Sequence, residues 1–251
     1  MDTAALKAYW LSEERARFAG WDFTYLAGRT ESSPMPWSYR DTVVSYLRET
    51  TDLLDMGTGG GEFLLSLSPP PGRTFATEAY PPNVALAHER LAPHGIEVRR
   101  IVSDAELPFP DGCFDLIMNR HESFDAGEVA RLLKPGGVFV TQQVGGANNR
   151  GLSDFLLDGR ASLIDPSFNL EMASNAIADS GLKVLEGKEC FPRKTFKDVG
   201  ALVYFAKVIE WEFPGFSVER CFDKLLQLHA AAERGHGIES REHRFLIVAK
   251  K

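Results

Sequence analysis

The sequence predicts an α/β fold with a doubly wound, mostly parallel sheet of seven strands. Short apolar segments alternate along most of the chain with helix-like segments of roughly 10 to 15 residues, which is the pattern of parallel strands joined by helices. A glycine-rich turn directly follows the apolar segment that begins at Leu53. The 251 residues suffice for one large α/β domain, or for a core domain with an elaborated cap.

The part of the chain before the sheet is helical and aromatic. Residues 3–19 predict a loosely amphipathic helix that ends at Gly20. A loop with several aromatic residues follows, and residues 38–49 predict a helix with Ser38 as its N-cap. The aromatic residues of this first part form either a lid over a ligand or ordinary core packing.

The predicted strands come next, separated by turns rich in glycine, proline and aspartate. They cover 53–55, 73–77, 96–102, 114–118, 138–144, 182–190 and 243–249. Pro81 and Pro82 fit the first turn of a helix after the second strand, where a missing backbone N–H costs nothing. Two further helical patterns, at 199–209 and 218–232, form an insertion before the last strand.

The composition argues against several classes of protein. The net charge of −7 is opposite to that of a protein that clamps phosphate backbones, so nucleic acid is not the expected partner. Apolar runs stop short of a membrane span and the N-terminus lacks a secretory signal, so we expect a cytoplasmic protein without a membrane partner. The three cysteines lie far apart with no C-x-x-C pair, which predicts reduced thiols and no metal site.

The turn at residues 55–61, D-M-G-T-G-G-G, carries more chemistry than any other stretch of the chain. Glycines after a strand let the backbone bend and bring its N–H groups against an anionic ligand at the start of the next helix. The dinucleotide pattern G-x-G-x-x-G fails, because its third glycine would fall on Glu62 or Leu64. The pattern that fits is D-x-G-x-G-x-G, with Asp55 in its first position.

This pattern resembles the first motif of the class I S-adenosylmethionine-dependent methyltransferases. The chain is also similar to the later motifs of that family, in their usual order, at F-A-T-E, I-V-S-D-A-E-L-P-F-P-D-G-C-F-D-L-I and L-L-K-P-G-G-V-F-V. The resemblance covers roughly residues 40–145. It implies a last strand antiparallel to the others, S-adenosyl-L-methionine as the cofactor and S-adenosyl-L-homocysteine as the product.

The resemblance also implies where the cofactor would bind. Glu78 would hold the ribose, and Asp104 with the N–H of Ala105 would hold the adenine. Asn119 and Arg120 would flank the sulfonium. The whole expected set is Asp55, Gly57, Thr58, Gly59, Gly61, Glu78, Ala79, Asp104, Ala105, Asn119 and Arg120. In a plainer interpretation the glycine turn binds no ligand, and the carboxylates at the strand ends only cap local backbone.

His121 is the candidate catalytic residue, because it follows the fourth predicted strand and its ring titrates near neutrality. Methyl transfer needs a general base only when the acceptor still carries its proton. His121 therefore acts either as a base, or as a residue that orients the loop or touches the substrate without taking a proton.

Four regions follow from these patterns. Residues 1–37 are an N-terminal cap, 38–194 the cofactor-binding core, 195–235 a helical insertion that caps the acceptor, and 236–251 the final strand of the core. The acceptor pocket is expected from the two caps and from polar residues at the strand ends. Its candidate residues are Trp21, Tyr25, Trp37, Tyr39, Gln142, Gln143 and Tyr204.

Together these features predict methyl transfer from S-adenosylmethionine to a small or medium-sized, partly apolar acceptor. Two alternatives stay open at this point. One is methylation of RNA, against which the acidic charge argues, and the other is a protein that binds the cofactor without transferring its methyl group.

Overall fold

The computed structural model describes residues 2–18, 23–159 and 163–251. By its contacts the chain divides into two compact units, each assembled from three separate stretches of sequence. We call them the core unit and the helical unit. The core unit consists of 36–144, 169–189 and 245–251, and the helical unit of 1–35, 145–168 and 190–244.

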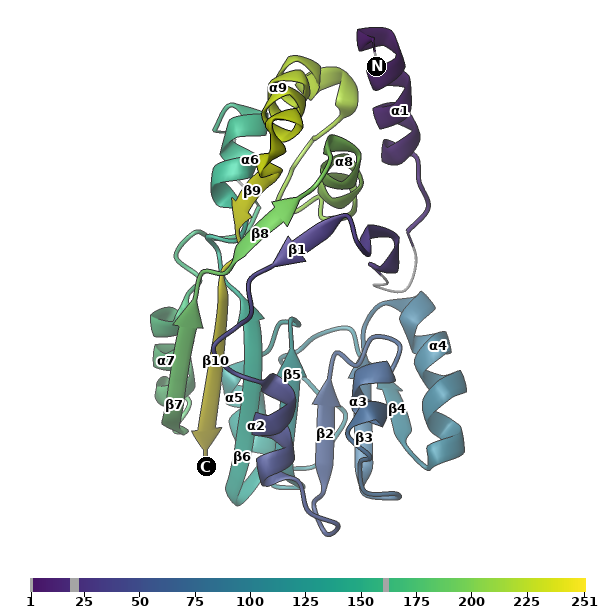
Figure 1. The fold of residues 1–251 in the computed structure, drawn as a ribbon. Helices are drawn as coiled ribbons and strands as arrows, with labels where there is room; N and C mark the ends of the chain where they lie inside the picture. Colours follow the sequence, from purple (N-terminus) through teal and green to yellow (C-terminus); the bar gives the residue numbers. More distant parts are fainter. Residues whose placement is uncertain (1, 19–22, 160–162) are drawn as a thin grey trace. The chain divides into compact units, whose positions relative to one another are not determined.

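The core unit contains a sheet of seven strands in the order β4-β3-β2-β5-β6-β10-β7. Neighbouring strands from β4 to β6 are parallel, whereas β10 runs in the opposite direction (Figure 1). The strands are β2 (Leu53–Met56), β3 (Thr74–Glu78), β4 (Glu97–Arg100), β5 (Phe114–Arg120), β6 (Leu133–Val144), β7 (Lys183–Cys190) and β10 (Arg244–Lys250). The predicted fold class, with its antiparallel last strand, is therefore confirmed.

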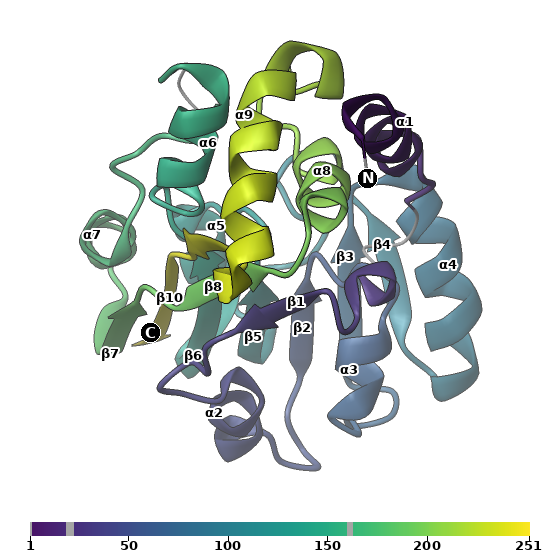
Figure 2. The ribbon, with the colours of Figure 1, turned by 45° about the horizontal axis from the view of Figure 1, so that its top comes forward.

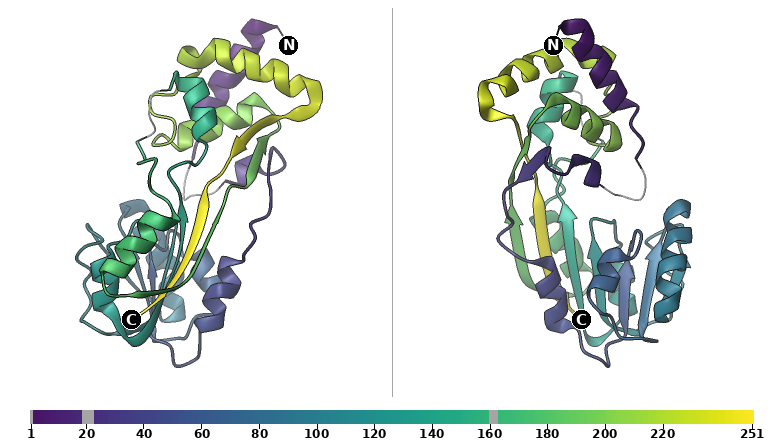
Figure 3. Two further views of the ribbon diagram at one scale, coloured as in Figure 1. Left: turned by 90° about the vertical axis from the view of Figure 1, so that its left-hand side faces the viewer. Right: turned by 45° about the vertical axis from the view of Figure 1, so that its right-hand side comes forward.

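Helices cover both faces of this sheet. Figures 1 and 3 show α2 against one face and α5 and α7 against the other. The helical segments are α2 (Tyr39–Tyr46), α3 (Glu62–Ser66), α4 (Pro81–Leu91), the 3-10 turn η2 (Ala92–His94), α5 (Ala126–Leu132) and α7 (Leu170–Asp179). Ser38 caps α2 by accepting from the N–H of Asp41, as predicted, and two prolines open α4.

Two strands are longer than the sequence predicts. β5 continues to Arg120, so Asn119 and Arg120 belong to the strand rather than to the loop after it. β6 begins at Leu133 instead of Val138, because Leu133 already pairs with Phe114 of β5. Residues 134–137 form a bulge between this pair and the next one, Leu116 with Val138. Within these residues, the N–H of Gly136 donates to the carbonyl of Lys251, the residue after β10.

The helical unit is built on a three-stranded antiparallel sheet in the order β1-β8-β9, which the sequence analysis did not predict. Its helices gather on one side of that sheet (Figure 2). The elements are α1 (Thr3–Glu14), η1 (Thr24–Leu26), β1 (Thr30–Ser32), α6 (Arg150–Leu157), β8 (Arg193–Phe196), α8 (Val199–Val208), α9 (Val218–Ala231), η3 (Ala232–His236) and β9 (Ile238–Arg241). The first helix is shorter than predicted, since it ends at Glu14.

The core of the helical unit lies around α8, in which eight residues from Val199 to Ala206 are buried. Trp10 of α1, 1% exposed, packs into the same cluster together with Leu225 of α9. A helix that is apolar on nearly every face must be covered on every face, and α8 therefore lies at the centre of this unit. None of the helices that the structure describes is both long and apolar enough to cross a membrane.

An ion-pair cluster ties the start of α8 to the N-terminal stretch. Asp198 caps α8 by accepting from the N–H of Ala201 at 2.8 Å. The same carboxylate accepts hydrogen bonds from Arg29, from Nε at 3.0 Å and from Nη2 at 2.6 Å. Arg29 also forms an ion pair with the buried Glu13.

Substitution of Asp198 should separate the cap from the ion pair. Asp198→Asn keeps an oxygen for the cap and loses the charge, so we expect a loss of less than about 1 kcal/mol in unfolding free energy, because this side chain is 40% exposed. Asp198→Ala loses both and should cost roughly 1–2 kcal/mol. Urea unfolding of the full chain measures the difference; equal losses for the two variants would show that the cap contributes nothing.

Candidate cofactor and acceptor site

The glycine turn between β2 and α3 is shaped by three residues in the left-handed region, with φ of 71° at Gly57, 62° at Gly59 and 82° at Gly61. The N–H groups of Gly57 and Thr58 donate to the carbonyl of Thr77 at 3.1 and 3.0 Å, which ties the turn to β3. A side chain added at Gly59 would meet nothing within 4 Å. The turn is thus fixed at its base and open at Gly59.

Glu78, at the end of β3, is 4% exposed and holds the turn from the other side. Its Oε2 accepts from the N–H of Gly59 at 2.8 Å, and its Oε1 accepts from the N–H groups of Ala79 and Tyr80 at 2.9 Å. The capping role that we considered as the plainer interpretation is therefore present. A cofactor role remains compatible with it, because a carboxylate can accept about four hydrogen bonds.

Asp55 lies under the turn and is 5% exposed. Burial raises the pKa of its carboxyl group to about 6, the charge of Glu78 adds to this effect, and Thr58 and Arg120 partly offset it. A carboxylate that is this poorly solvated and faces a like charge gains from a cationic partner. The structure thus places a buried carboxyl group, whose ionised form a cation would stabilise, beside an open backbone turn.

Asp104 and Ala105, in the segment after β4, lie at the same edge of the sheet. Asp104 is half-buried, and the hydroxyl of Ser123 donates to its carboxylate. The N–H of Ala105 donates to the hydroxyl of Ser103 at 3.2 Å. Their proposed contacts with adenine stay predictions.

Glu122 belongs to this group of acids, although the sequence analysis did not include it among the site residues. Its side chain lies so close over Gly57 that a Cβ there would overlap the Glu122 Cγ and Cβ. Burial raises the pKa of its carboxyl group, and the charges of Asp104 and Glu78 raise it further. Its place two residues after β5, in a loop at the carboxyl edge of the sheet, was the available signal.

A network of buried polar groups joins the ends of β5 and β6. Asn119 is fully buried, and its Oδ1 accepts from the hydroxyl of Thr141 at 2.8 Å and from Gln143 Nε2 at 2.5 Å. Gln143 Nε2 also donates to the carbonyl of Glu122 at 2.9 Å. Asn119 and Gln143 thus shape the loop, so a direct contact of either with a ligand stays a prediction.

The aromatic candidates of the core unit lie beside this network rather than over an open surface. The indole N–H of Trp37 donates to Gln142 Oε1 at 2.8 Å, and Gln142 Nε2 lies 3.0 Å from His121 Nε2. The hydroxyl of Tyr39 donates to the carbonyl of Asn119 at 3.0 Å. Trp37 and Tyr39 are 9% and 5% exposed, so each ring is packed in this unit.

Arg120, by contrast, is exposed, and its guanidinium lies 4.1 Å from the centre of the Phe63 ring. It lowers the pKa of Asp55 and is the basic residue of the expected cofactor set. Phe63 belongs to α3, so the cation sits over the helix that the glycine turn begins.

The remaining acceptor candidates do not belong to the core unit. Tyr25 and Tyr204 lie in the helical unit, where their ring centres are 4.5 Å apart. Tyr204 is 2% exposed and packs in the core of that unit, whereas Tyr25 is 48% exposed. Trp21 lies outside the residues that the structure describes. Their acceptor roles stay predictions.

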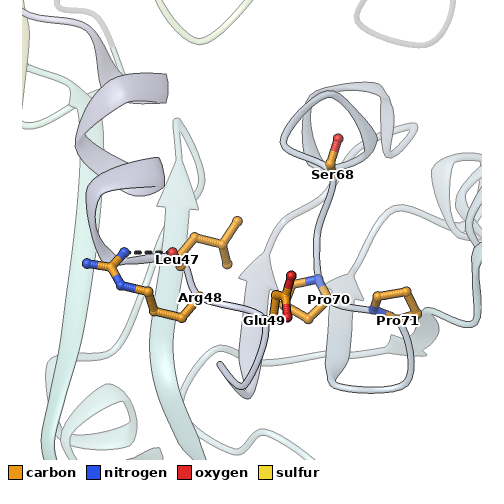
Figure 4. Close-up of a pocket in the computed structure, with 6 residues that line it drawn as sticks. All are labelled: Leu47, Arg48, Glu49, Ser68, Pro70 and Pro71. Carbon is orange, nitrogen blue, oxygen red and sulfur yellow. Dashed lines mark hydrogen bonds between the residues drawn. The ribbon is translucent and has the colours of Figure 1, made fainter.

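A hollow of about 660 Å³ lies elsewhere on the core unit (Figure 4). It is lined by Leu47, Arg48, Glu49, Ser68, Pro70 and Pro71. These residues precede β2 and β3, at the amino ends of the strands, whereas the glycine turn follows β2. The hollow is therefore separate from the candidate site, because ligands of open α/β sheets bind at the carboxyl ends.

Comparison with known proteins agrees with this geometry. Residues 54–141 match the family model of a methyltransferase domain. This segment contains five neighbouring strands of the seven-stranded sheet, from β4 at its edge to most of β6, and it includes the glycine turn, Glu78 and Asp104. The core unit has the fold of the class I methyltransferases, and this segment of it is similar to a methyltransferase domain.

A curated relative of the chain is a demethylmenaquinone methyltransferase from Thermus thermophilus. The two are 32% identical over 114 residues, which make up 41% of this chain and 52% of that protein. The chain thus spans about half the length of the relative.

Two solved structures share the fold. One is a SAM-dependent methyltransferase from Aquifex aeolicus, with a TM-score of 0.51 at 14% identity over 100% of this chain and 98% of that one. The other is a (4+2)-cyclase, with a TM-score of 0.55 at 16% identity over 84% of this chain and 79% of that one. At such identities the likeness shows the fold alone.

Removing the charge of Asp55 should stabilise the ligand-free core unit. Because the folded state raises this carboxyl pKa from 3.8 to about 6, it binds the proton more tightly than the unfolded chain does. Stability is therefore lost as the pH rises from about 4 to about 6, and above that range the loss stays constant at no more than about 3 kcal/mol.

We expect Asp55→Asn to abolish this loss, so that its advantage over the natural protein grows from pH 4 to pH 7. Chemical unfolding at several pH values measures it, with Glu89→Gln, an exposed carboxylate on α4, as the control. An advantage that does not change with pH would contradict the assignment.

Proposed function

We propose that the chain is an S-adenosylmethionine-dependent methyltransferase that acts on a small or medium-sized, partly apolar acceptor. The observation that carries this proposal is the turn at Gly59, which is open to a ligand, anchored by Glu78 and placed over the buried acid Asp55 in a methyltransferase domain.

The residues present suit the methionine end of the cofactor. Its carboxylate needs N–H donors. Because the N–H groups of Gly57, Thr58, Gly59 and Gly61 already donate within the protein, the donors would be those of Gly60 and of the first turn of α3. Its ammonium needs an acid, and Asp55 is the buried acid whose ionisation the surroundings now oppose. Binding of the ammonium would favour the ionised form of Asp55, so affinity for the cofactor should fall as the pH drops below about 6.

The surroundings of Glu78 suit the ribose and the adenine. Glu78 keeps capacity for a further hydrogen bond, as a ribose hydroxyl requires. Beyond the paired positions Glu78 and Arg100 of β3 and β4, two apolar side chains are exposed: Tyr80 at 59% and Val102 at 92%. Exposed apolar side chains beside a polar strand end are suited to a flat aromatic base.

When bound, the cofactor supplies a methyl group on a positively charged sulfur, and it carries a net positive charge. Asp55, Glu78, Asp104 and Glu122 give the site the opposite sign. Of the nearby cations, Arg90 is paired with Glu62, and Arg120 lies against the ring of Phe63. The protein's own contribution is then to hold the two reactants in line and to exclude water, which is the larger part of catalysis in such a displacement.

The acceptor class is supported by the relative from Thermus thermophilus. That protein is named for demethylmenaquinone, a largely apolar ring compound. Hydroxylated or quinone-type rings are therefore the first acceptors to test, and the acidic net charge continues to argue against RNA.

Transfer of a labelled methyl group from S-adenosylmethionine to a panel of such rings tests the function. Transfer to a ring acceptor supports the proposal. Binding of the cofactor without any transfer favours a non-catalytic cofactor-binding protein, and salt-sensitive labelling of RNA favours the RNA alternative. If the protein binds neither S-adenosylmethionine nor S-adenosylhomocysteine, the proposal and both alternatives are overturned.

A matched pair of glycine variants tests the binding site itself. Gly59 and Gly72 both have positive φ, at 62° and 71°, and a Cβ at either would meet nothing within 4 Å. Ala at either position should therefore cost a similar 1–2 kcal/mol or so of stability. Only Gly59→Ala places a methyl group in the proposed site, so we expect at least about tenfold weaker binding of S-adenosylhomocysteine by calorimetry for Gly59→Ala, and unchanged binding for Gly72→Ala. Equal affinities would remove Gly59 from the site.

A further inference from the structure

The hydrogen bonds around Gln142 determine which ring nitrogen of His121 carries a proton. Gln142 is 3% exposed and lies between two side chains, with Trp37 Nε1 at 2.8 Å from its Oε1 and His121 Nε2 at 3.0 Å from its Nε2. The three side chains come from separate elements: the segment before α2, β6 and the loop after β5.

The orientation of the Gln142 amide follows from chemistry. An indole N–H can only donate, so the group that faces Trp37 must be the amide oxygen. The amide NH₂ then faces His121, and an NH₂ group can also only donate. His121 Nε2 must therefore accept, which it does only when it carries no proton.

We infer that Trp37 and Gln142 are positioning residues that hold neutral His121 in the tautomer with its proton on Nδ1. In the opposite tautomer, the Nε2–H would face the amide NH₂ of Gln142. The amide could turn to accept it only by presenting its NH₂ to the indole N–H of Trp37. Either arrangement places two donors against each other at one end of a buried side chain.

The backbone supports the same arrangement. The N–H of His121 donates to the carbonyl of Gln142 at 2.8 Å, and His121 has φ of 62°, a conformation that few residues other than glycine adopt. A strained backbone at this point persists only if its surroundings hold it, and the contacts with Gln142 do so from both main chain and side chain.

The tautomer decides between the two roles that His121 could have. A general base needs an accessible lone pair, and the lone pair of Nε2 is already committed to Gln142. In this tautomer the hydrogen that the ring can donate is on Nδ1, and Nε2 could act as a base only after its contact with Gln142 is broken. This consequence for catalysis rests on the proposed function, but the tautomer does not.

Nitrogen-15 NMR of the full chain, labelled at histidine, tests the inference without any substrate. Spectra are recorded at a pH where the ring is neutral, and the signal of His121 is assigned by its loss in His121→Asn. We expect the natural protein to show the Nδ1–H tautomer. In Trp37→Phe the Gln142 amide is free to turn, so the ratio of the tautomers should shift roughly tenfold toward Nε2–H, which corresponds to one hydrogen bond of about 1.4 kcal/mol.

A second variant keeps the test decisive if Trp37→Phe does not fold. Gln142→Glu replaces the NH₂ by an oxygen that accepts, so it should also favour a proton on Nε2, with Trp37 intact. The inference is overturned if neutral His121 in the natural protein carries its proton on Nε2. It is also overturned if the ratio of the two tautomers in either folded variant equals that of the natural protein. Since cofactor binding and methyl transfer are measured separately, failure of the proposed function would leave this result unaffected.

Discussion

The candidate site depends on the contact between the carboxylate of Glu78 and the backbone of the glycine turn. Buried carboxylates must be satisfied, and Glu78 is satisfied by the N–H groups of Gly59, Ala79 and Tyr80. The contact fixes the turn only because Gly57, Gly59 and Gly61 adopt positive φ without strain. One interaction thus joins the end of β3, the start of α3 and the start of α4 around a common opening.

Negative charge is concentrated at this opening at a cost to the empty protein. Burial raises the pKa of both Asp55 and Glu122. The charge of Glu78 raises the pKa of both groups further, and that of Asp104 adds to the effect on Glu122, which lies over Gly57. Charges that repel each other in the free protein become favourable when a cation enters. The same acids that reduce stability would therefore attract a net positive cofactor, and would hold its neutral product less tightly.

The sequence predicted the sheet well because its signals are local. The glycine turn, the prolines of α4 and the N-cap at Ser38 each act within a few residues, and the structure has them where they were expected. Strand ends were less predictable: β6 begins at Leu133 because β5 and β10 lie on either side of it, and partners distant in sequence leave no local pattern. The small sheet β1-β8-β9 was missed for the same reason.

For the site, the sequence could indicate which residues lie at the carboxyl edge but not what they touch. Trp37 and Gln142 were expected to meet an acceptor, and the structure shows them bonded to each other beside His121. Glu122 received no role, since only the fold brings its side chain against Gly57. Such pairings depend on side-chain direction across neighbouring strands, which spacing along the chain does not define.

The most direct test of the account is a crystal structure of the full chain with S-adenosylhomocysteine. We expect the ligand at the carboxyl edge of the sheet, with its amino acid end against the turn at Gly59 and beside Asp55, and its ribose hydroxyls on Glu78. The account would be contradicted if the ligand bound away from this turn. It would also be contradicted if the turn stayed empty in the crystal although calorimetry shows that the complex forms.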